Sequence, residues 1–436
     1  MQRTSSSDLS HAGMLFDESL QRQIKARFHQ VDHDYDGIPR LFFDNAGGSF
    51  RLKSAIEQHA AIDALPDCTE RMHSGARYLQ EIQSKGTEDF RLMLNAKGGS
   101  VFASLTASGA MFDMVRAIAE NVPGKNFVTT VLEHPSAFDA VTYYADRLGK
   151  ELRVAASNPF TGGVDVEEIV SKIDADTVLL SVIYASNISG AKIDLAEIVR
   201  QARLIKPDLY IIVDAVQHAP HGVIDLQETP VDALNIALYK FFGCRGSGMS
   251  WLSDRAARLP HHKLIAKPAG VWDLGSAAPA QFAVVSAVVD YVCWLGSHVS
   301  PSTDKRTLFV QGMHSIELHE RALLARLLEG DGDIKGLRHI DGAKVLLDYP
   351  DLRKRDLIVA MAFERLSPAD AVREYEKRGV IVYERVSSSL YSRRMLESFE
   401  IEGAIRISPL HCHSSDDIDR FLSITADIAA THNVIA

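Results

Sequence analysis

Short apolar runs, each followed by a helical repeat, occupy the middle of the 436-residue chain. The runs are rich in valine, isoleucine and leucine, and several are apolar throughout, which is typical of strands buried on both faces. They lie at residues 101–106, 127–132, 152–156, 178–184, 209–213, 234–239 and 249–252. Alternation of strands and helices predicts an α/β fold whose large domain holds a mostly parallel, seven-stranded sheet covered by helices.

Helix-start signals fill the intervals between these runs. Asp194 and Glu197 have the spacing of a capping box. Pro135 suits the first turn of another helix, because its fixed backbone angle is already helical and its missing N–H is not needed there. Both positions predict helices that begin directly after a strand and a short turn.

A polar stretch at 296–304, with three serines, one glycine and one proline, is the strongest boundary signal. We expect an N-terminal segment over residues 1–44 that packs with the small domain, a large cofactor-binding domain over 45–298, and a smaller α+β domain over 299–436. Elements of the small domain are expected near 312–328 (helix), 356–363 (strand), 368–377 (helix), 379–384 (strand), 403–408 (strand) and 415–430 (helix).

Composition excludes several classes of protein. With 47 Lys and Arg against 57 Asp and Glu, the net charge is −10, so no nucleic-acid or anionic-membrane partner is expected. There is no run of 18 apolar residues and no signal-peptide pattern at the N-terminus, so we expect no transmembrane helix. The four cysteines, Cys68, Cys244, Cys293 and Cys412, form no CxxC pair, and the reducing cytoplasm is the expected location.

Three motifs fail on inspection. Residues 243–248 are glycine-rich without the G-x-G-x-x-G order. The acidic stretch 32–37 opens like a calcium loop but has Phe43 where a glutamate is required. The triplet 411–413, His-Cys-His, is expected at a strand edge, where alternate side chains point to opposite faces. We therefore expect no metal site.

Two ionisable side chains follow buried apolar runs. Asp214 ends the run 209–213, and Lys240 follows the run 234–239. The carboxyl ends of parallel strands are where open α/β sheets bind ligands, and a buried lysine is costly unless it is paired or chemically used. A structural ion pair is one interpretation. The other is pyridoxal phosphate, with Lys240 forming the Schiff base and Asp214 pairing the pyridinium nitrogen.

At these residues the chain resembles fold-type-I pyridoxal-phosphate enzymes of aminotransferase class V, which include cysteine desulfurases, selenocysteine lyase, isopenicillin N epimerase and kynureninase. The resemblance covers residues 40–430 in motif order, and the stretches 214–221 and 239–243 look most similar to cysteine desulfurase-like members of the group. It implies that Lys240 is the Schiff-base lysine and the base that moves the substrate α-proton. Asp214 then keeps the ring an electron sink.

The resemblance assigns further cofactor contacts. His134 matches a ring-stacking histidine, with a simple helix-start histidine as the alternative, and Asn187 and Gln217 match the groups that face the phenolic oxygen. The phosphate is expected at a strand-to-helix turn, with these contacts: Ser108, Gly109, Ala110, Met111 and Tyr239. Ser276 matches a hydroxyl that reaches the neighbouring subunit's phosphate, which implies a homodimer.

The substrate side is also implied by the resemblance. Arg406 matches the arginine that clamps the substrate carboxylate, and Asn45, Ala46 and Gly47 match the N-terminal substrate-side loop. The substrate is therefore expected to be a small molecule of the amino-acid type.

The reaction is not determined by these motifs. The loop that carries the nucleophilic cysteine of desulfurases reads serine at 387–389, so persulfide chemistry is not expected there. An aminotransferase is the first hypothesis. A C–S or C–Se β-lyase, an epimerase and a catalytically silent pyridoxal-phosphate-binding homologue are the alternatives. His218 and His221 are open between a structural role and substrate contact.

Overall fold

A seven-stranded sheet forms the centre of the large domain in the computed structural model, which describes residues 12–276 and 278–433. The strand order is β2-β8-β7-β6-β5-β3-β4, with β8 antiparallel to both neighbours and the β7-β6-β5-β3-β4 pairs parallel. The strands are β2 (Ser100–Ser104), β3 (Asn126–Thr130), β4 (Glu151–Ala155), β5 (Thr177–Ile183), β6 (Tyr210–Asp214), β7 (Ala233–Ala237) and β8 (Gly248–Leu252). The predicted fold class is confirmed.

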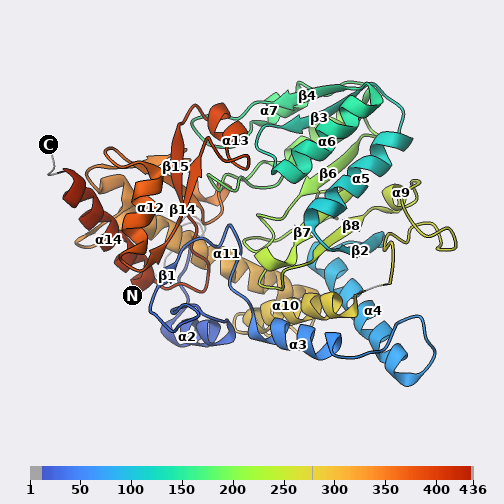
Figure 1. The fold of residues 1–436 in the computed structure, drawn as a ribbon, viewed down its shortest axis with the longest axis horizontal. Helices are drawn as coiled ribbons and strands as arrows, with labels where there is room; N and C mark the ends of the chain where they lie inside the picture. Colours follow the sequence, from blue (N-terminus) through green and yellow to red (C-terminus); the bar gives the residue numbers. More distant parts are fainter. Residues whose placement is uncertain (1–11, 277, 434–436) are drawn as a thin grey trace.

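Both faces of this sheet are buried, which explains the unbroken apolar runs in the sequence. Successive residues point to opposite faces: Leu179 and Ile212 belong to one apolar cluster, whereas Leu180 and Ile211 belong to another. One cluster includes α5 and α6, and the other includes α4, α8, α10 and α11 (Figure 1). The helices of this domain are α3 (Lys53–Asp63), α4 (Ser74–Leu94), α5 (Ala107–Asn121), α6 (Pro135–Leu148), α7 (Val166–Val170), α8 (Leu195–Ile205), α9 (Asp254–Ala257), α10 (Pro279–Ser297) and α11 (Lys305–Glu329).

The two predicted helix starts are present. The Asp194 side chain accepts a hydrogen bond from the N–H of Glu197 ahead of α8, and Pro135 occupies the first turn of α6. These local signals need no tertiary partner, because the cap satisfies backbone N–H groups within one turn.

Helix α10 bears on the expectation that the chain has no transmembrane helix. It is long and apolar enough to cross a membrane by length and composition, although the sequence suggested no such segment. Its apolar stretch is 78% buried inside the protein, and it packs between α3, α4 and α11 (Figure 1). A helix that is apolar all round is typical of a buried core helix as well as of a membrane span, and here α10 is a core helix.

The small domain is built on a four-stranded antiparallel sheet of order β11-β12-β15-β14. It follows α10, which ends at Ser297, and the long helix α11, which begins at Lys305. Its elements are β9 (Gly330–Asp331), β10 (Ile334–Lys335), β11 (Ala343–Leu346), β12 (Val359–Phe363), α12 (Pro368–Glu376), β13 (Val380–Ile381), β14 (Tyr383–Val386), α13 (Arg393–Ser398), β15 (Gly403–Ile407) and α14 (Ser415–Asn433).

The N-terminal segment contacts both domains. Its strand β1 (Leu41–Phe42) pairs in parallel with β13 of the small domain. Helix α2 (Glu18–Arg27) lies under the large domain (Figure 1), and Phe28 after it packs edge-on against Phe242 at 5.6 Å. Residues 1–11 of the predicted segment lie outside the described residues. The N-terminal segment therefore bridges the two domains. It leads directly into the predicted substrate-side loop, which begins at Asn45.

Candidate active site

A cavity of about 320 Å³ opens at the carboxyl ends of the parallel strands. Ile183, Asp214 and Ala237, the last residues of β5, β6 and β7, all line it, as expected for ligand sites of open α/β sheets. The cavity brings together seven of the predicted site residues: Ser108, His134, Asn187, Asp214, Gln217, Tyr239 and Lys240.

Lys240 reaches the cavity from a turn and not from a strand. Strand β7 ends at Ala237, and a 3₁₀ turn over Leu238–Lys240 follows, whereas the sequence predicted a strand through residue 239. The Lys240 side chain is buried, and its Nζ lies 3.4 Å from Oε1 of Gln217. Burial, with the positive charge of Arg406, lowers the pKa of Lys240 to about 8. A larger fraction of this amine than of an ordinary lysine is therefore neutral and nucleophilic near neutral pH.

Asp214 lies at the end of β6 on the same cavity. One carboxylate oxygen accepts a hydrogen bond from the N–H of Val216 at 3.0 Å. Burial raises the pKa of this carboxyl, and the Val216 bond and the charge of Lys240 oppose the rise. A buried carboxylate is stabilised by a cationic partner, and a protonated ring nitrogen would supply one.

The amide side chains fit a polar ligand. Asn187 is buried, and its Oδ1 has no hydrogen-bond partner in the described part of the chain. Such an orphaned oxygen costs free energy unless a ligand or water satisfies it. Asn187, Gln217 and Lys240 line one cavity that also holds Asp214, so these donor and acceptor groups fit a pyridine ring with a phenolic oxygen.

His134 is both a helix cap and a cavity residue. Its Nδ1 accepts a hydrogen bond from the N–H of Ser136 at 3.2 Å, at the start of α6, and its ring lines the cavity. Burial, with the charges of Lys240 and Arg385, lowers the pKa of His134 to about 4. The imidazole is neutral at physiological pH, which suits stacking on a flat ring.

The phosphate turn lies earlier than predicted. Thr106 caps α5 by accepting from the N–H of Gly109 at 3.0 Å, and residues 106–108 line the cavity. Gly109, Ala110 and Met111 are not lining residues, and Met111 is packed in the apolar core. Because the helix begins at Ala107, position 111 lies one turn inside it and faces the sheet.

The substrate-side residues lie next to the cavity without lining it. Arg406 is 3% exposed and donates to Oδ1 of Asp44 at 2.5 Å and to the carbonyl of Asn187 at 3.1 Å. At Gly47 a Cβ atom would stand 2.9 Å from Oδ2 of Asp44 and 3.2 Å from Nη2 of Arg406, so the loop approaches this ion pair closely.

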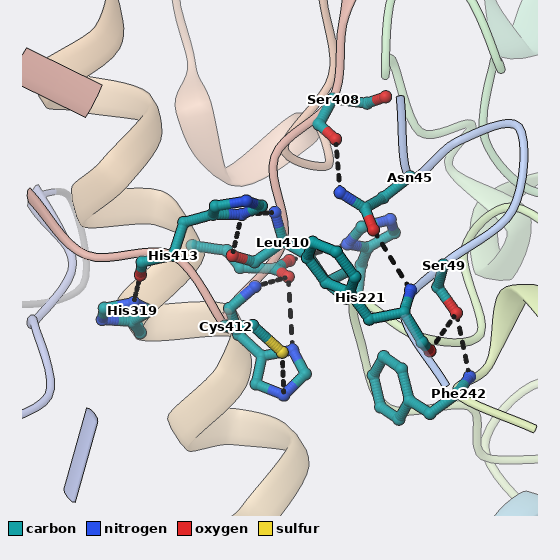
Figure 2. A network of polar contacts seen from close by, with 12 residues as sticks. Asn45, Ser49, His221, Phe242, His319, Ser408, Leu410, Cys412 and His413 are labelled. Atoms are coloured by element: carbon teal, nitrogen blue, oxygen red, sulfur yellow. Dashed lines mark hydrogen bonds and ion pairs between the residues drawn. The ribbon is translucent and has the colours of Figure 1, made fainter. Parts of the chain in front are cut away.

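Figure 2 shows how the substrate-side loop is attached to the small domain. Nδ2 of Asn45 donates to the carbonyl of Ser408 at 3.1 Å, and its Oδ1 accepts from the N–H of Phe50 at 3.3 Å. The N–H of Ala46 donates to Oγ of Ser408 at 3.1 Å. Asn45 and Ala46 are thus anchoring residues, and Ser408 follows the strand that carries Arg406.

Ser276 lies outside the cavity. Its exposed hydroxyl donates to Oε1 of Glu70 at 2.9 Å. The role implied for it requires a second subunit, and it stays a prediction.

Three charged residues near the site were missed. Arg385 on β14 is buried, and its Nε has no hydrogen-bond partner in the described residues. Arg245 lines the cavity from the glycine-rich stretch that failed as a nucleotide motif. Glu133 is buried next to the cavity residue Ile183, and its Oε1 accepts from the N–H of Ile183 and from the hydroxyl of Thr130, each at 2.7 Å. The sequence offered no signal for the first two, since neither arginine belongs to a recognisable pattern.

His218 and His221 have carboxylate partners away from Lys240. Nδ1 of His218 lies 3.1 Å from both oxygens of Asp356, and Nδ1 of His221 lies 2.7 Å from Oε2 of Glu320. Neither histidine lines the cavity that holds Lys240. This geometry favours the structural interpretation of both.

The cysteines are not placed for catalysis. Cys412 lies in a buried turn after β15 (Figure 2), which corrects the expected strand for 411–413, and burial raises the pKa of its thiol. Cys244 and Cys293 are buried as well, and Cys68 is exposed in the loop before α4. The loop after β14 holds serines at 387–389.

Glutamine at position 133 is expected to change how stability depends on pH. Burial raises the pKa of Glu133 to about 8. Between pH 4.5 and 8 the folded protein keeps this proton and the unfolded chain does not. The wild-type free energy of unfolding therefore falls with rising pH by up to about 1.4 kcal/mol per unit. The Glu133→Gln variant has no titrating group at this position. Its free energy of unfolding relative to that of the wild type should therefore rise from pH 5 to pH 8, as measured by urea unfolding. Parallel profiles would contradict the assignment.

The fold and the cavity define a pyridoxal-phosphate-dependent enzyme of fold type I, and Lys240 and Asp214 both line the cavity. The chain belongs to the aminotransferase class-V family, whose profile matches residues 41–265.

Relatives agree with this membership. A probable cysteine desulfurase of Xylella fastidiosa is 23% identical over 92% of this chain and 94% of its own length. A cysteine desulfurase of Haloferax volcanii is 26% identical over 50% of this chain and 52% of its own length. Solved cysteine desulfurases from Thermococcus onnurineus and Escherichia coli match with TM-scores of 0.81 and 0.77 at 17% identity. They cover 96% of this chain and 100% and 99% of theirs, which shows the fold.

Proposed function

We propose that the protein is a class-V aminotransferase acting on a small amino acid or an amino-bearing metabolite. One observation carries the proposal. The cavity holds a buried lysine whose pKa is lowered to about 8, and the loop after β14 that could supply a nucleophile has serines in place of a thiol. When bound, pyridoxal phosphate supplies an electron-withdrawing ring that stabilises negative charge at the substrate α-carbon.

The residues of the chain divide the remaining tasks. Nζ of Lys240 takes the α-proton and returns it, since a neutral amine can accept a proton and its conjugate acid can donate one. Asp214 holds positive charge on the ring nitrogen. Arg406, oriented by Asp44 at 2.5 Å, binds the substrate carboxylate and thereby sets which bond to the α-carbon is broken. Two half-reactions in ping-pong order follow.

A β-lyase is the second candidate. It is supported by the printed names of the relatives, which are cysteine desulfurases. Without a thiol on the 387–389 loop, such an enzyme would expel sulfur or selenium directly, without a protein persulfide. Epimerisation is a third outcome of the same proton abstraction. Lys240 and Asp214 are intact, which argues against a silent homologue.

Incubation of the holoenzyme with an amino-acid panel separates these candidates. Transfer of the amino group to a keto acid without release of ammonia is the expected result. Pyruvate formed together with ammonia, sulfide or selenide would instead identify the lyase, and inversion at the α-carbon alone would identify the epimerase. Mass spectrometry of the products, with ¹⁵N-labelled donors, distinguishes the three.

A homodimer in the cytoplasm is part of the proposal. Apolar side chains are exposed beside the cavity: Leu105 is 80% exposed, and Leu274 is 57% exposed on the loop that contacts β2. Burial of these groups against a second copy would bring Ser276 near the partner's cavity. Sedimentation equilibrium giving the mass of one chain would contradict the dimer.

A further inference from the structure

We propose that Arg245 is the cation that binds the phosphate of pyridoxal phosphate. The proposal concerns cofactor binding only and does not depend on which reaction the protein catalyses. It rests on the position of the Arg245 loop, on the two neighbours that hold the guanidinium, and on the lack of a counter-charge.

The Arg245 loop lies against the phosphate turn. Residues 245–247 and 106–108 line one cavity. A Cβ atom on Gly248 would stand 2.4 Å from the backbone nitrogen of Ala107, so the two backbones are in contact. The first-turn N–H groups of α5, which attract anions, and the loop that carries Arg245 therefore meet at one end of the cavity.

Two neighbours hold the guanidinium at this end. Its central carbon lies 4.4 Å from the ring centroid of Tyr239, a cation–π distance. Its Nη2 would be 2.8 Å from a Cβ atom on Gly48, so the glycine leaves the space that the guanidinium occupies. Tyr239 directly precedes Lys240, so the arginine is held near the cavity by the segment that carries the lysine.

Within the described residues, the charge of Arg245 has no ion-pair or hydrogen-bond partner. The nearby guanidinium of Arg51 is partly buried, and burial, together with the charge of Arg245, lowers its pKa. Arg51 does not line the cavity, so Arg245 is the arginine that presents an unneutralised charge there, and such a charge attracts an anion.

The other groups at this end of the cavity are neutral donors. The hydroxyls of Ser108, Ser247 and Tyr239 line the cavity, and the Thr106 hydroxyl, which accepts from Gly109, can still donate its own proton. A dianionic phosphate bound only by backbone N–H groups and hydroxyls would lack a full counter-charge. Arginine supplies it with the fork geometry that matches phosphate oxygens.

Cofactor titrations of the full-length chain test this assignment. We compare the wild type, Arg245→Gln and Arg245→Lys, each freed of cofactor, with pyridoxal phosphate and with pyridoxal, which lacks the phosphate. Arg245→Gln is expected to weaken pyridoxal phosphate binding about 10-fold or more and to leave pyridoxal binding within about twofold. Arg245→Lys should retain most of the affinity. Arg326→Gln, remote on α11 and paired with Asp419, is the matched control.

The two ligands make the outcome decisive. Equal losses for both ligands would mean that Arg245 supports the ring or the fold, and unchanged binding of both would mean that it does not contact the phosphate. Either result overturns the proposal. So does a variant that binds pyridoxal phosphate normally and loses affinity only for a substrate with an acidic side chain, because Arg245 would then be a substrate residue. Thermal unfolding of each variant checks that the chain is folded.

Discussion

Replacement of Lys240 by alanine is expected to lower the rate of α-proton exchange in amino acids about a thousandfold or more, because the variant lacks the amine that moves the α-proton. It should also prevent the covalent link to the cofactor. Exchange is measured by the loss of the α-proton signal in deuterated water. Borohydride reduction followed by peptide mass spectrometry locates the link in the wild type at Lys240, whose Nζ lies 3.4 Å from Gln217 in the cavity.

A second lysine provides the control. Lys192 pairs with Glu317 at 3.7 Å and does not line the cavity of Lys240. Lys192→Ala should therefore keep both the exchange rate and the label. If Lys240→Ala still carried a borohydride-fixed cofactor at another lysine, the central assignment of the site would be wrong.

Asparagine at position 214 is expected to lower kcat about 100-fold to 1000-fold while the protein stays folded. Asn has nearly the same shape as Asp but no charge, so it cannot hold a proton on the ring nitrogen, and a lost electrostatic contact of this kind costs about that much. Burial raises the pKa of Asp214 in the protein without cofactor. Removal of a charge that burial disfavours should leave Tm unchanged or higher.

Kinetics and calorimetry separate the two effects for Asp214→Asn. A large loss of kcat with an unchanged Tm supports the pyridine-partner role. A comparable loss of stability would mean that Asp214 holds the strand ends together, and an unchanged kcat would remove it from the chemistry. Asp225→Asn, at a half-buried loop position that pairs with Arg306 at 3.2 Å and does not line the cavity, serves as the comparison.

The strands and the two central residues could be predicted because they depend on local pattern. Leu179 and Leu180 face opposite apolar clusters, so an unbroken apolar run was a reliable sign of a doubly covered strand. Asp214 was recognisable for a related reason, because a charged residue directly after a buried apolar strand is unusual. Lys240 was predicted correctly as a cavity residue even though its strand ends earlier.

Contacts that depend on tertiary structure could not be predicted from the sequence. The residues of the predicted phosphate turn that face the cavity depend on where α5 begins. The helix begins a few residues earlier than expected, so Met111 lies in the core and not in the cavity. The pairing of Arg406 with Asp44 joins residues 362 positions apart. Arg245 has no pattern of its own, and only the approach of Gly248 to Ala107 brings its loop to the cavity.

The pairing of β1 with β13 has a consequence for the order in which a ribosome completes this protein. Every residue that lines the cofactor cavity lies between Leu105 and Ser247, so that half of the site can fold while synthesis continues. The loop at Asn45 is synthesised before the cavity residues. It cannot form its hydrogen bond to Ser408 until that residue has been made, 363 positions later. Contacts between residues so far apart in the sequence form slowly, so this part of the site forms last. A nascent chain can therefore bind its cofactor well before it can hold a substrate.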